Sequence, residues 1–184
     1  MTKSPKIGFI CGSTRSGSIN QQLKKALMRL AKAKGARTSD INLERFELPL
    51  FHGDLDRPAG VKMLISKMKS CDSIIVITPE YNGGLPPLLK NAIDWVSTAG
   101  KEQFTQPVYG IASCTPGPMS GIMCMRQLNY ILMRVGAEVV PVQVGTGGGG
   151  AAFDAKGNLT AQPSAMLADK MLDQLLMRCA QKSK

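Results

Sequence analysis

The sequence has little of what metal sites and disulfide frameworks are built from. It contains one histidine, His52, and five cysteines that are scattered without the spacing of metal ligands. We therefore predict no metal site, and an odd number of scattered cysteines favours reduced, buried thiols in a cytoplasmic protein. His52 lies two residues before Asp54. A proton-transfer role is one interpretation of this pair, and we favour the alternative, a surface histidine.

Long apolar runs are also missing. No stretch of about 18 consecutive apolar residues occurs, which is the length that a membrane-spanning helix needs. Residues 1–5 are polar and lead directly into an apolar segment, which is not the pattern of a signal peptide. We expect a cytoplasmic protein with no membrane partner.

Acidic residues are scarce, because 13 Asp and Glu stand against 23 Lys and Arg and leave a formal net charge of +10. Such an excess is typical of proteins that bind nucleic acid or an anionic small molecule. No dense basic tract is interleaved with aromatic residues, which are only 5% of the chain, so we predict no nucleic-acid partner. We expect solvated helix faces for the basic residues Lys24, Lys25, Arg29, Lys32, Lys34, Arg37, Lys62, Lys67 and Lys69.

What the sequence does contain is a regular alternation of strands and helices. Short β-branched runs predict strands at 6–11, 39–43, 73–78, 107–113 and 138–144. Apolar residues at helical spacing predict helices at 20–34, 59–70, 86–96, 122–135 and 163–180. This alternation predicts one α/β domain over 1–184, a flavodoxin-like doubly wound five-stranded parallel sheet of order 2-1-3-4-5 with helices on both faces. Trp95 is expected in its core.

The loop between the first strand and the first helix, residues 12–18, has the form of an anion site. Unpaired backbone N–H groups and the positive end of the helix dipole meet there, and small residues allow close approach. Ser13, Ser18 and Asn20 can add side-chain donors, and Arg15 adds a charged fork of donors. The loop lacks the Gly-Lys-Ser/Thr of a triphosphate loop. The alternative is that Ser18 only caps the helix.

A second polar loop, residues 79–84, follows the third strand. Its glycines, Gly83 and Gly84, let the backbone approach a flat or bulky group, while Tyr81 offers an aromatic face and Asn82 offers donors and an acceptor. The alternative is a turn with a packed tyrosine. A third Gly/Pro-rich loop, 114–121, follows the fourth strand, and the predicted order brings all three loops to one edge of the sheet.

The run Gly145–Gly150 fits the pattern G-x-G-x-x-G. A dinucleotide fingerprint also needs a helix immediately after it, and residues 151–158 are typical of a turn instead. We therefore reject the fingerprint and predict a flexible loop, with a subunit contact as one possible use of it.

Three segments resemble the NADPH-dependent FMN reductase family. They are the loop 12–20, the segment 78–83 together with 89–95, and the weaker patch 48–51. The resemblance implies that Ser13, Arg15, Ser18, Ile19 and Asn20 bind the FMN phosphate. It also implies that the isoalloxazine is lined by Pro79, Glu80, Tyr81, Asn82 and Gly83, with Ser113 and Gly117 at its other edge. The sequence departs from the family at Pro87, where Gly is common, and at the prolines Pro116 and Pro118.

The resemblance implies an FMN-dependent oxidoreductase that works in two half-reactions. NADPH or NADH would give a hydride to N5 of FMN, and a quinone, azo dye, free flavin or metal oxyanion would take the electrons. No side-chain acid or base is required, so no catalytic residue is assigned, and a homodimer or homotetramer is expected. Two alternatives are a flavodoxin-like electron carrier and a non-catalytic FMN-binding sensor. The charge of +10 and Arg15 argue against the carrier.

Overall fold

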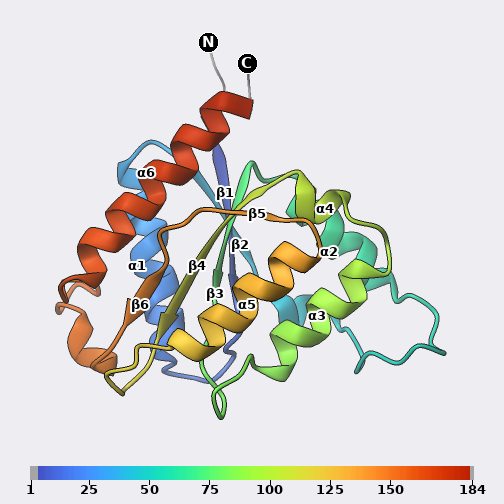
Figure 1. Ribbon diagram of the computed structural model, residues 1–184, viewed down its shortest axis with the longest axis horizontal. Helices are drawn as coiled ribbons and strands as arrows, with labels where there is room; N and C mark the ends of the chain where they lie inside the picture. Colours follow the sequence, from blue (N-terminus) through green and yellow to red (C-terminus); the bar gives the residue numbers. More distant parts are fainter. Residues whose placement is uncertain (1–3, 183–184) are drawn as a thin grey trace.

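The computed structural model describes residues 4–182, so most of the polar start at residues 1–5 lies outside the described part. Its centre is one parallel sheet in the order β2-β1-β3-β4-β5, with β6 also paired to β4, as Figure 1 shows. The predicted fold class and strand order are confirmed. The strands are β1 (Lys6–Cys11), β2 (Arg37–Ile41), β3 (Ser73–Ile77), β4 (Val108–Cys114), β5 (Glu138–Val139) and β6 (Val144–Thr146).

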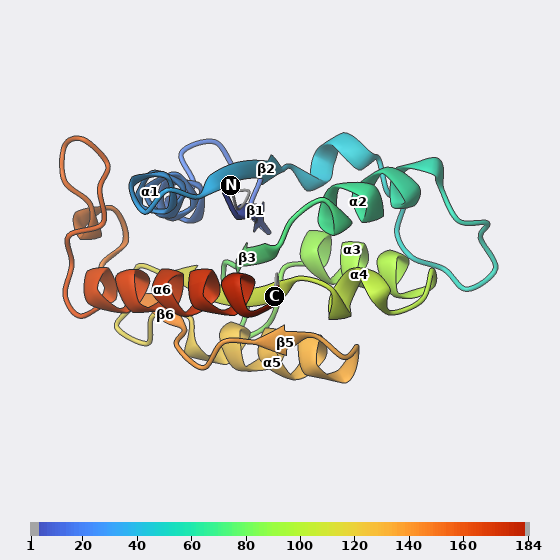
Figure 2. The same cartoon turned by 90° about the horizontal axis from the view of Figure 1, so that it is seen from above.

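Helices cover both faces of this sheet, which Figure 2 shows from above. The helices α1 (Ile19–Ala33) and α6 (Ser164–Lys182) bury Leu23, Leu27 and Leu172 against one face. The other face is covered by α2 (Ala59–Lys69), α3 (Pro87–Ser97), α5 (Ile122–Arg134) and the short α4 (Glu102–Thr105). Each long helix has the apolar spacing that its sequence predicts, because a sheet that is covered on both sides buries one stripe of every helix.

The structure corrects the predicted fifth strand, which is interrupted rather than continuous. Only Gly110 and Ile111 separate Tyr109 from Ala112 on β4, whereas four residues, 140–143, separate their partners Val139 and Val144. Pro141 lies in this interruption and has no N–H to give to a strand ladder. The sheet therefore has six strands where five were expected.

Two smaller differences concern the surroundings of β2 and β4. The second strand begins two residues earlier than predicted and ends at Ile41, because Leu43–Phe46 forms a 3₁₀-helix, η1. The side chain of Asn42 starts that helix by accepting the N–H of Glu44 at 3.1 Å. The helix α4 lies in a segment, 98–106, for which no helix or strand was predicted.

Lys24 is an exception among the basic residues. It is only 6% exposed, and its Nζ lies 2.8 Å from both carboxylate oxygens of Asp40 on β2. The expectation of a solvated helix face is therefore wrong for Lys24. An ammonium group in this position requires a carboxylate partner, since burial of an unpaired charge is unfavourable.

The predicted burial of Trp95 and of the five thiols is confirmed. Trp95 is 1% exposed, and its indole N–H donates to the carbonyl of Pro49 at 2.6 Å. All five cysteines are buried thiols outside any disulfide, and burial raises the pKa of each thiol, that of Cys114 to about 11. They are therefore protonated and unreactive near neutral pH.

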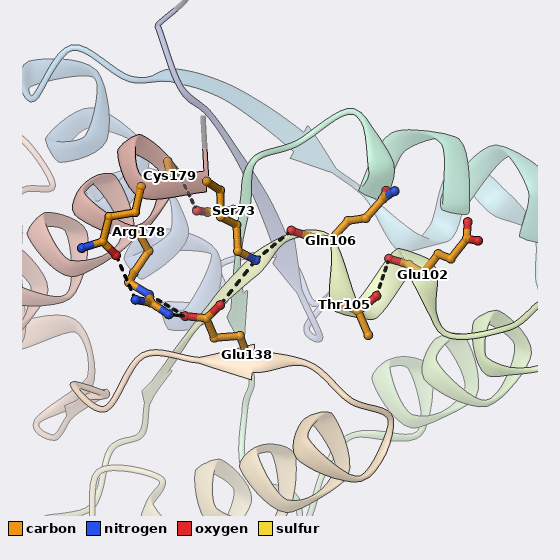
Figure 3. A network of polar contacts seen from close by, with 9 residues as sticks. Ser73, Glu102, Thr105, Gln106, Glu138, Arg178 and Cys179 are labelled. Atoms are coloured by element: carbon orange, nitrogen blue, oxygen red, sulfur yellow. Dashed lines mark hydrogen bonds and ion pairs between the residues drawn. The ribbon is translucent and has the colours of Figure 1, made fainter. Parts of the chain in front are cut away.

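A polar network holds the last turns of α6 on β5 (Figure 3). The guanidinium of Arg178 donates from Nε to Glu138 at 2.6 Å, and the ammonium of Lys182 lies 3.4 Å from the same carboxylate. Lys182 also donates to the carbonyl of Gln106 at 3.1 Å. In the same view, Ser73 and Cys179 join β3 to α6 through a contact of 2.8 Å. One carboxylate thus links the short strand β5 to two cations of α6.

We expect Glu138→Gln to lower the free energy of unfolding by less than about 1 kcal/mol at pH 7, because both side chains of the Arg178–Glu138 pair are partly exposed to solvent. Partial burial raises the pKa of Glu138, and the hydrogen bonds from Arg178 and Lys182 more than offset this, so the net shift is downward. A lowered carboxyl pKa stabilises the folded state above the unfolded pKa, and this contribution is lost as pH falls through the folded pKa. Urea unfolding at pH 7 and at pH 3 measures it. The difference from the wild type should be smaller at pH 3 than at pH 7, and Glu47→Gln, at an exposed side chain, is the control.

Candidate functional site: the carboxyl edge of the sheet

The loops that follow β1, β3 and β4 meet at one edge of the sheet, in the lower part of Figure 1. The first two are in direct contact. The N–H of Gly12 donates to the carbonyl of Ile77 at 2.8 Å, and a Cβ on Gly12 would lie 2.8 Å from the ring of Pro86 and 3.3 Å from that of Pro79. Gly12 is therefore required for the close approach of the two loops.

The loop 12–18 presents an unused set of donors. Among residues 4–182, the backbone N–H groups of Thr14, Arg15, Ser16 and Ile19 have no acceptor, and the Arg15 guanidinium has no hydrogen bond or ion pair. The hydroxyl of Ser18 accepts the N–H of Gln21 at 3.3 Å, so Ser18 caps α1. A set of N–H donors with one guanidinium at a helix N-terminus fits a phosphate dianion.

Ser13 lies in the same loop and is 4% exposed. Its carbonyl accepts from the side-chain amide of Gln21 at 2.5 Å, which fixes the loop on the first turn of α1. Sequence reasoning did not single out Gln21. Its position three residues after the cap was the available signal, since that position faces back toward the loop.

The side chain of Asn20 is hydrogen-bonded within the fold. Its side-chain amide donates to the carbonyl of Cys114 at 2.8 Å, and its Oδ1 accepts the N–H of Cys114 at 2.9 Å. The residue is 2% exposed. The side chain therefore joins α1 to the end of β4, and what Asn20 offers an anion is its backbone N–H.

The second loop contains a two-residue turn. Tyr81 and Gly84 exchange both backbone hydrogen bonds at 3.0 Å, and the central residues Asn82 and Gly83 have φ of 51° and 77°. Positive φ at both positions is the geometry of a type I′ turn, for which Asn-Gly is the preferred sequence. The N–H groups of Asn82 and Gly83 have no acceptor among the described residues, and Tyr81 is 50% exposed. The turn of the alternative interpretation is therefore present, but its tyrosine is half exposed and not packed.

Glu80 and Pro79 directly precede this turn, and hydrogen bonds hold both residues in the fold. The Glu80 carboxylate accepts the N–H of Cys124 at 3.1 Å, in the first turn of α5, where Gly121 provides no side-chain cap. The negative charge at a helix N-terminus is favourable. Pro79 is buried, and its carbonyl accepts from the hydroxyl of Thr78 at 2.8 Å. Both residues thus position the turn.

The structure places Ser113 and Gly117 differently from each other. Ser113 is fully buried beneath α5, with its hydroxyl 3.6 Å from the Cys124 sulfur, so its side chain does not reach the surface of the site. Gly117 lies in the loop after β4, where its carbonyl accepts the hydroxyl of Thr115 at 3.1 Å. Thr115 was missed by sequence reasoning, and its place directly after a buried strand was the available signal.

Two further contacts hold this third loop, and they correct the prediction for Gly145–Gly150. The N–H of Thr115 donates to the carbonyl of Thr146 at 2.9 Å, and the N–H of Gly149 donates to the carbonyl of Thr115 at 3.1 Å. Gly145 and Thr146 belong to β6, and the 3₁₀-helix η2 covers Gly149–Ala152. The segment is therefore held in place rather than a flexible loop. A 3₁₀ turn in place of a following α-helix agrees with the rejection of a dinucleotide fingerprint.

Two patches of the family resemblance, 40 residues apart in sequence, contact each other. Asn91 donates from Nδ2 to the carbonyl of Pro49 at 2.9 Å and accepts the N–H of Phe51 at 2.6 Å. The Phe51 ring meets the Trp95 ring edge-on at 5.0 Å between centroids. Asn91 and Trp95 thus hold the segment 48–51 on α3. His52 follows this segment, is exposed, and accepts the N–H of Asp54 at 3.3 Å.

Other kinds of site find no support in the part of the chain that the structure describes. Residues 4–182 contain no group of three or more His, Cys, Asp and Glu side chains placed to hold a metal ion. Within the same range, no helix has the length and apolar content that crossing a membrane requires.

A parallel sheet whose carboxyl edge joins a phosphate-type donor loop to an exposed aromatic turn defines a flavodoxin-like, mononucleotide-binding protein. The donor set fits the phosphate of FMN. The sequence model of the NADPH-dependent FMN reductase family matches residues 5–151, and the chain belongs to this family. It is accordingly an oxidoreductase that uses FMN with NAD(P)H as the electron donor.

Known proteins similar to the chain agree with this assignment. A quinone reductase of Escherichia coli is 29% identical over 146 residues, 76% of each chain. An NAD(P)H-dependent FMN reductase of Pseudomonas aeruginosa is 29% identical over 182 residues, 95% of each chain. Among solved structures, the flavoenzyme FerB, an NAD(P)H:acceptor oxidoreductase of Paracoccus denitrificans, superposes with a TM-score of 0.82 at 25% identity. That alignment covers 96% of this chain and 98% of FerB.

Proposed function

We propose that the chain passes electrons from NAD(P)H to small-molecule acceptors in two separate half-reactions. Quinones are the first acceptor class to test, because relatives carry the name quinone reductase. Azo compounds, free flavins and metal oxyanions are the others. When bound, FMN supplies hydride chemistry at N5 of its ring. The observation that carries the proposal is the pair of unused donor sets, at 14–19 and at 82–83, on one edge of the sheet.

The first donor set binds the phosphate in this proposal. The free N–H groups of Thr14, Arg15, Ser16 and Ile19 and the Arg15 guanidinium surround the start of α1, where the helix dipole adds to the attraction. Ser18 has its O–H available because it acts only as an acceptor toward Gln21. Their combined charge orients the cofactor with its phosphate toward α1.

The second donor set binds the ring. The N–H groups of Asn82 and Gly83 can donate to polar atoms at the ring edge, and such donors stabilise added electron density. Glu80 holds the turn on α5, so these N–H groups are fixed before the cofactor arrives. Tyr81, half exposed, provides a flat side chain beside the ring. No side-chain acid or base of this chain is assigned a proton transfer.

An anaerobic titration of the FMN-loaded protein with NADPH tests the proposal. We expect stoichiometric bleaching of the visible flavin band, followed by its return when benzoquinone is added without oxygen. Steady-state rates at several benzoquinone concentrations should give parallel double-reciprocal lines. Tight FMN binding without bleaching by either NADPH or NADH would contradict the proposal and favour an electron carrier or a sensor.

We further propose that the chain acts in the cytoplasm as a homodimer or homotetramer and folds as one domain. A surface of α5 supports self-association, because Met123, Tyr130 and Met133 lie on one face of the helix and are 50%, 69% and 62% exposed. Light scattering coupled to size-exclusion chromatography measures the mass. We expect Tyr130→Glu to lower it to that of a monomer, and an unchanged mass in this variant would exclude α5 as the contact.

A further inference from the structure

A basic hollow lies beside the proposed phosphate loop and has no part in the steps described above. It is formed between the outward face of α1 and the segment 150–157, which lie side by side in Figures 1 and 2. The side chains that line it are Gln22, Lys25, Arg29, Phe153, Asp154 and Lys156.

The charge of this hollow is positive and largely uncompensated. Three cations, Lys25, Arg29 and Lys156, face one carboxylate, Asp154, which leaves two net positive charges. Arg29 donates to neutral oxygens, the carbonyl of Gly157 and Oδ1 of Asn158, and so keeps its charge available. Neither Lys25 nor Lys156 makes an ion pair within residues 4–182.

The one carboxylate that lines the hollow, that of Asp154, already accepts hydrogen bonds. The Asp154 carboxylate accepts the backbone N–H of Asn158 at 2.8 Å and its side-chain amide at 3.0 Å. Phe153, next to it, is half-buried and lines the same hollow. Cations beside an aromatic surface suit a ligand that carries a phosphate and a flat base, that is, an adenosine phosphate.

Two residues that line the hollow, Gln22 and Gly150, directly follow in sequence residues that are hydrogen-bonded to loops of the proposed FMN site. Gln22 follows Gln21, whose side chain bonds to Ser13 in the loop 12–18. Gly150 follows Gly149, whose N–H bonds to Thr115 in the loop after β4. A dinucleotide is longer than FMN by a second ribose, a phosphate and an adenine. When a dinucleotide delivers its hydride at the carboxyl edge of the sheet, its further phosphate and its adenine base must therefore bind beyond the FMN site.

We propose that this hollow binds the adenosine 2′-phosphate end of NADPH, and that Lys25 and Lys156 thereby select NADPH over NADH. The inference rests on the proposed function, since it assigns the electron donor of that same site. NADH carries a hydroxyl where NADPH carries the 2′-phosphate, so the two lysines act on NADPH alone.

Calorimetric binding to the FMN-loaded protein tests the hollow without turnover. The probes are adenosine 2′,5′-bisphosphate and adenosine 5′-monophosphate, which lacks the 2′-phosphate. We expect the wild type to bind the bisphosphate about tenfold more tightly, as charge-assisted hydrogen bonds to one added phosphate imply. In the double variant Lys25→Gln/Lys156→Gln this preference should disappear. The control is Lys62→Gln/Lys67→Gln on α2, behind the other face of the sheet, where the preference should persist.

Steady-state kinetics gives a second, independent readout. We expect the Lys25→Gln/Lys156→Gln variant to raise KM for NADPH about tenfold while KM for NADH and both kcat values stay unchanged. Equal binding of the two probes by the wild type, or an equal change of KM for both dinucleotides in the variant, would overturn the inference. If neither dinucleotide reduces the flavin, the proposed function fails, and the calorimetric comparison still decides whether the hollow binds the 2′-phosphate.

Discussion

Replacing Asn20 by alanine is expected to lower the free energy of unfolding by about 2–6 kcal/mol, because it leaves two buried backbone groups without a hydrogen-bond partner and each costs about 1–3 kcal/mol. These groups are the N–H and the carbonyl of Cys114, which the Asn20 side chain pairs at 2.9 and 2.8 Å. Both residues are nearly inaccessible, at 2% and 1% exposed, so water cannot easily replace the lost amide. Urea unfolding of the apoprotein measures the change.

The matched control for Asn20→Ala is Asn129→Ala on α5. Within residues 4–182 the Asn129 amide donates only to the sulfur of Met133, at 3.4 Å, and a change of less than about 0.5 kcal/mol is expected there, as for most surface substitutions. An Asn20→Ala protein as stable as the wild type, with FMN binding lost, would contradict the structural role and restore the side chain to the phosphate site.

Arg15→Ala is expected to act in the opposite way, on cofactor binding and not on stability. The guanidinium has no hydrogen bond or ion pair among residues 4–182, so the apoprotein should unfold at the same urea concentration. FMN affinity should fall by about 1.5–3 kcal/mol, the range for hydrogen bonds to charged groups, which is about tenfold to a hundredfold in Kd. Quenching of FMN fluorescence on binding gives the affinity.

Two further variants separate the effect of the Arg15 donor geometry on FMN affinity from the effect of net charge. Arg15→Lys keeps the charge but lacks the planar fork of donors, and it should bind FMN with intermediate affinity. Arg45→Ala, at an exposed residue of η1, removes the same charge outside the loop 12–18 and should leave affinity unchanged. If Arg45→Ala weakened FMN binding as much as Arg15→Ala, the loss of affinity would come from the lower net charge of the protein and not from a contact between Arg15 and the phosphate. Unchanged affinity in Arg15→Ala would remove the phosphate assignment.

The order of the sheet was predictable because the signals were local and repeated. A buried run such as 73–77, followed by a Gly-containing loop and a helix with Pro at its start, defines one strand–helix unit by itself. The interruption between β5 and β6 was not predictable in the same way. Pro141 marks the place, but the extra residues are visible only against β4, a partner about 30 positions away in sequence.

The features of the candidate site also differ in whether neighbouring residues in the sequence predict them. The type I′ turn at Asn82-Gly83 and the cap at Ser18 follow from the sequence, since each depends on neighbouring residues. The roles of Asn20, Ser113 and Glu80 do not. Each of these side chains meets an element at least 11 residues away, and a polar residue at a loop has the same appearance whether it faces a ligand or its own fold.

The interruption of the last strand has a consequence for how copies of this protein can associate. A regular outer strand offers a row of free N–H and carbonyl groups onto which a second sheet can add, and a bulge or a proline removes that opportunity. Here the outer strand is reduced to two short pieces, two and three residues long, on either side of Pro141. On the opposite border, β2 carries Arg37 and Asp40, and charged side chains discourage the same addition. Continuous sheets that cross from one copy to another are therefore disfavoured, which leaves the helical layers and the loops as the surfaces for any assembly of this protein.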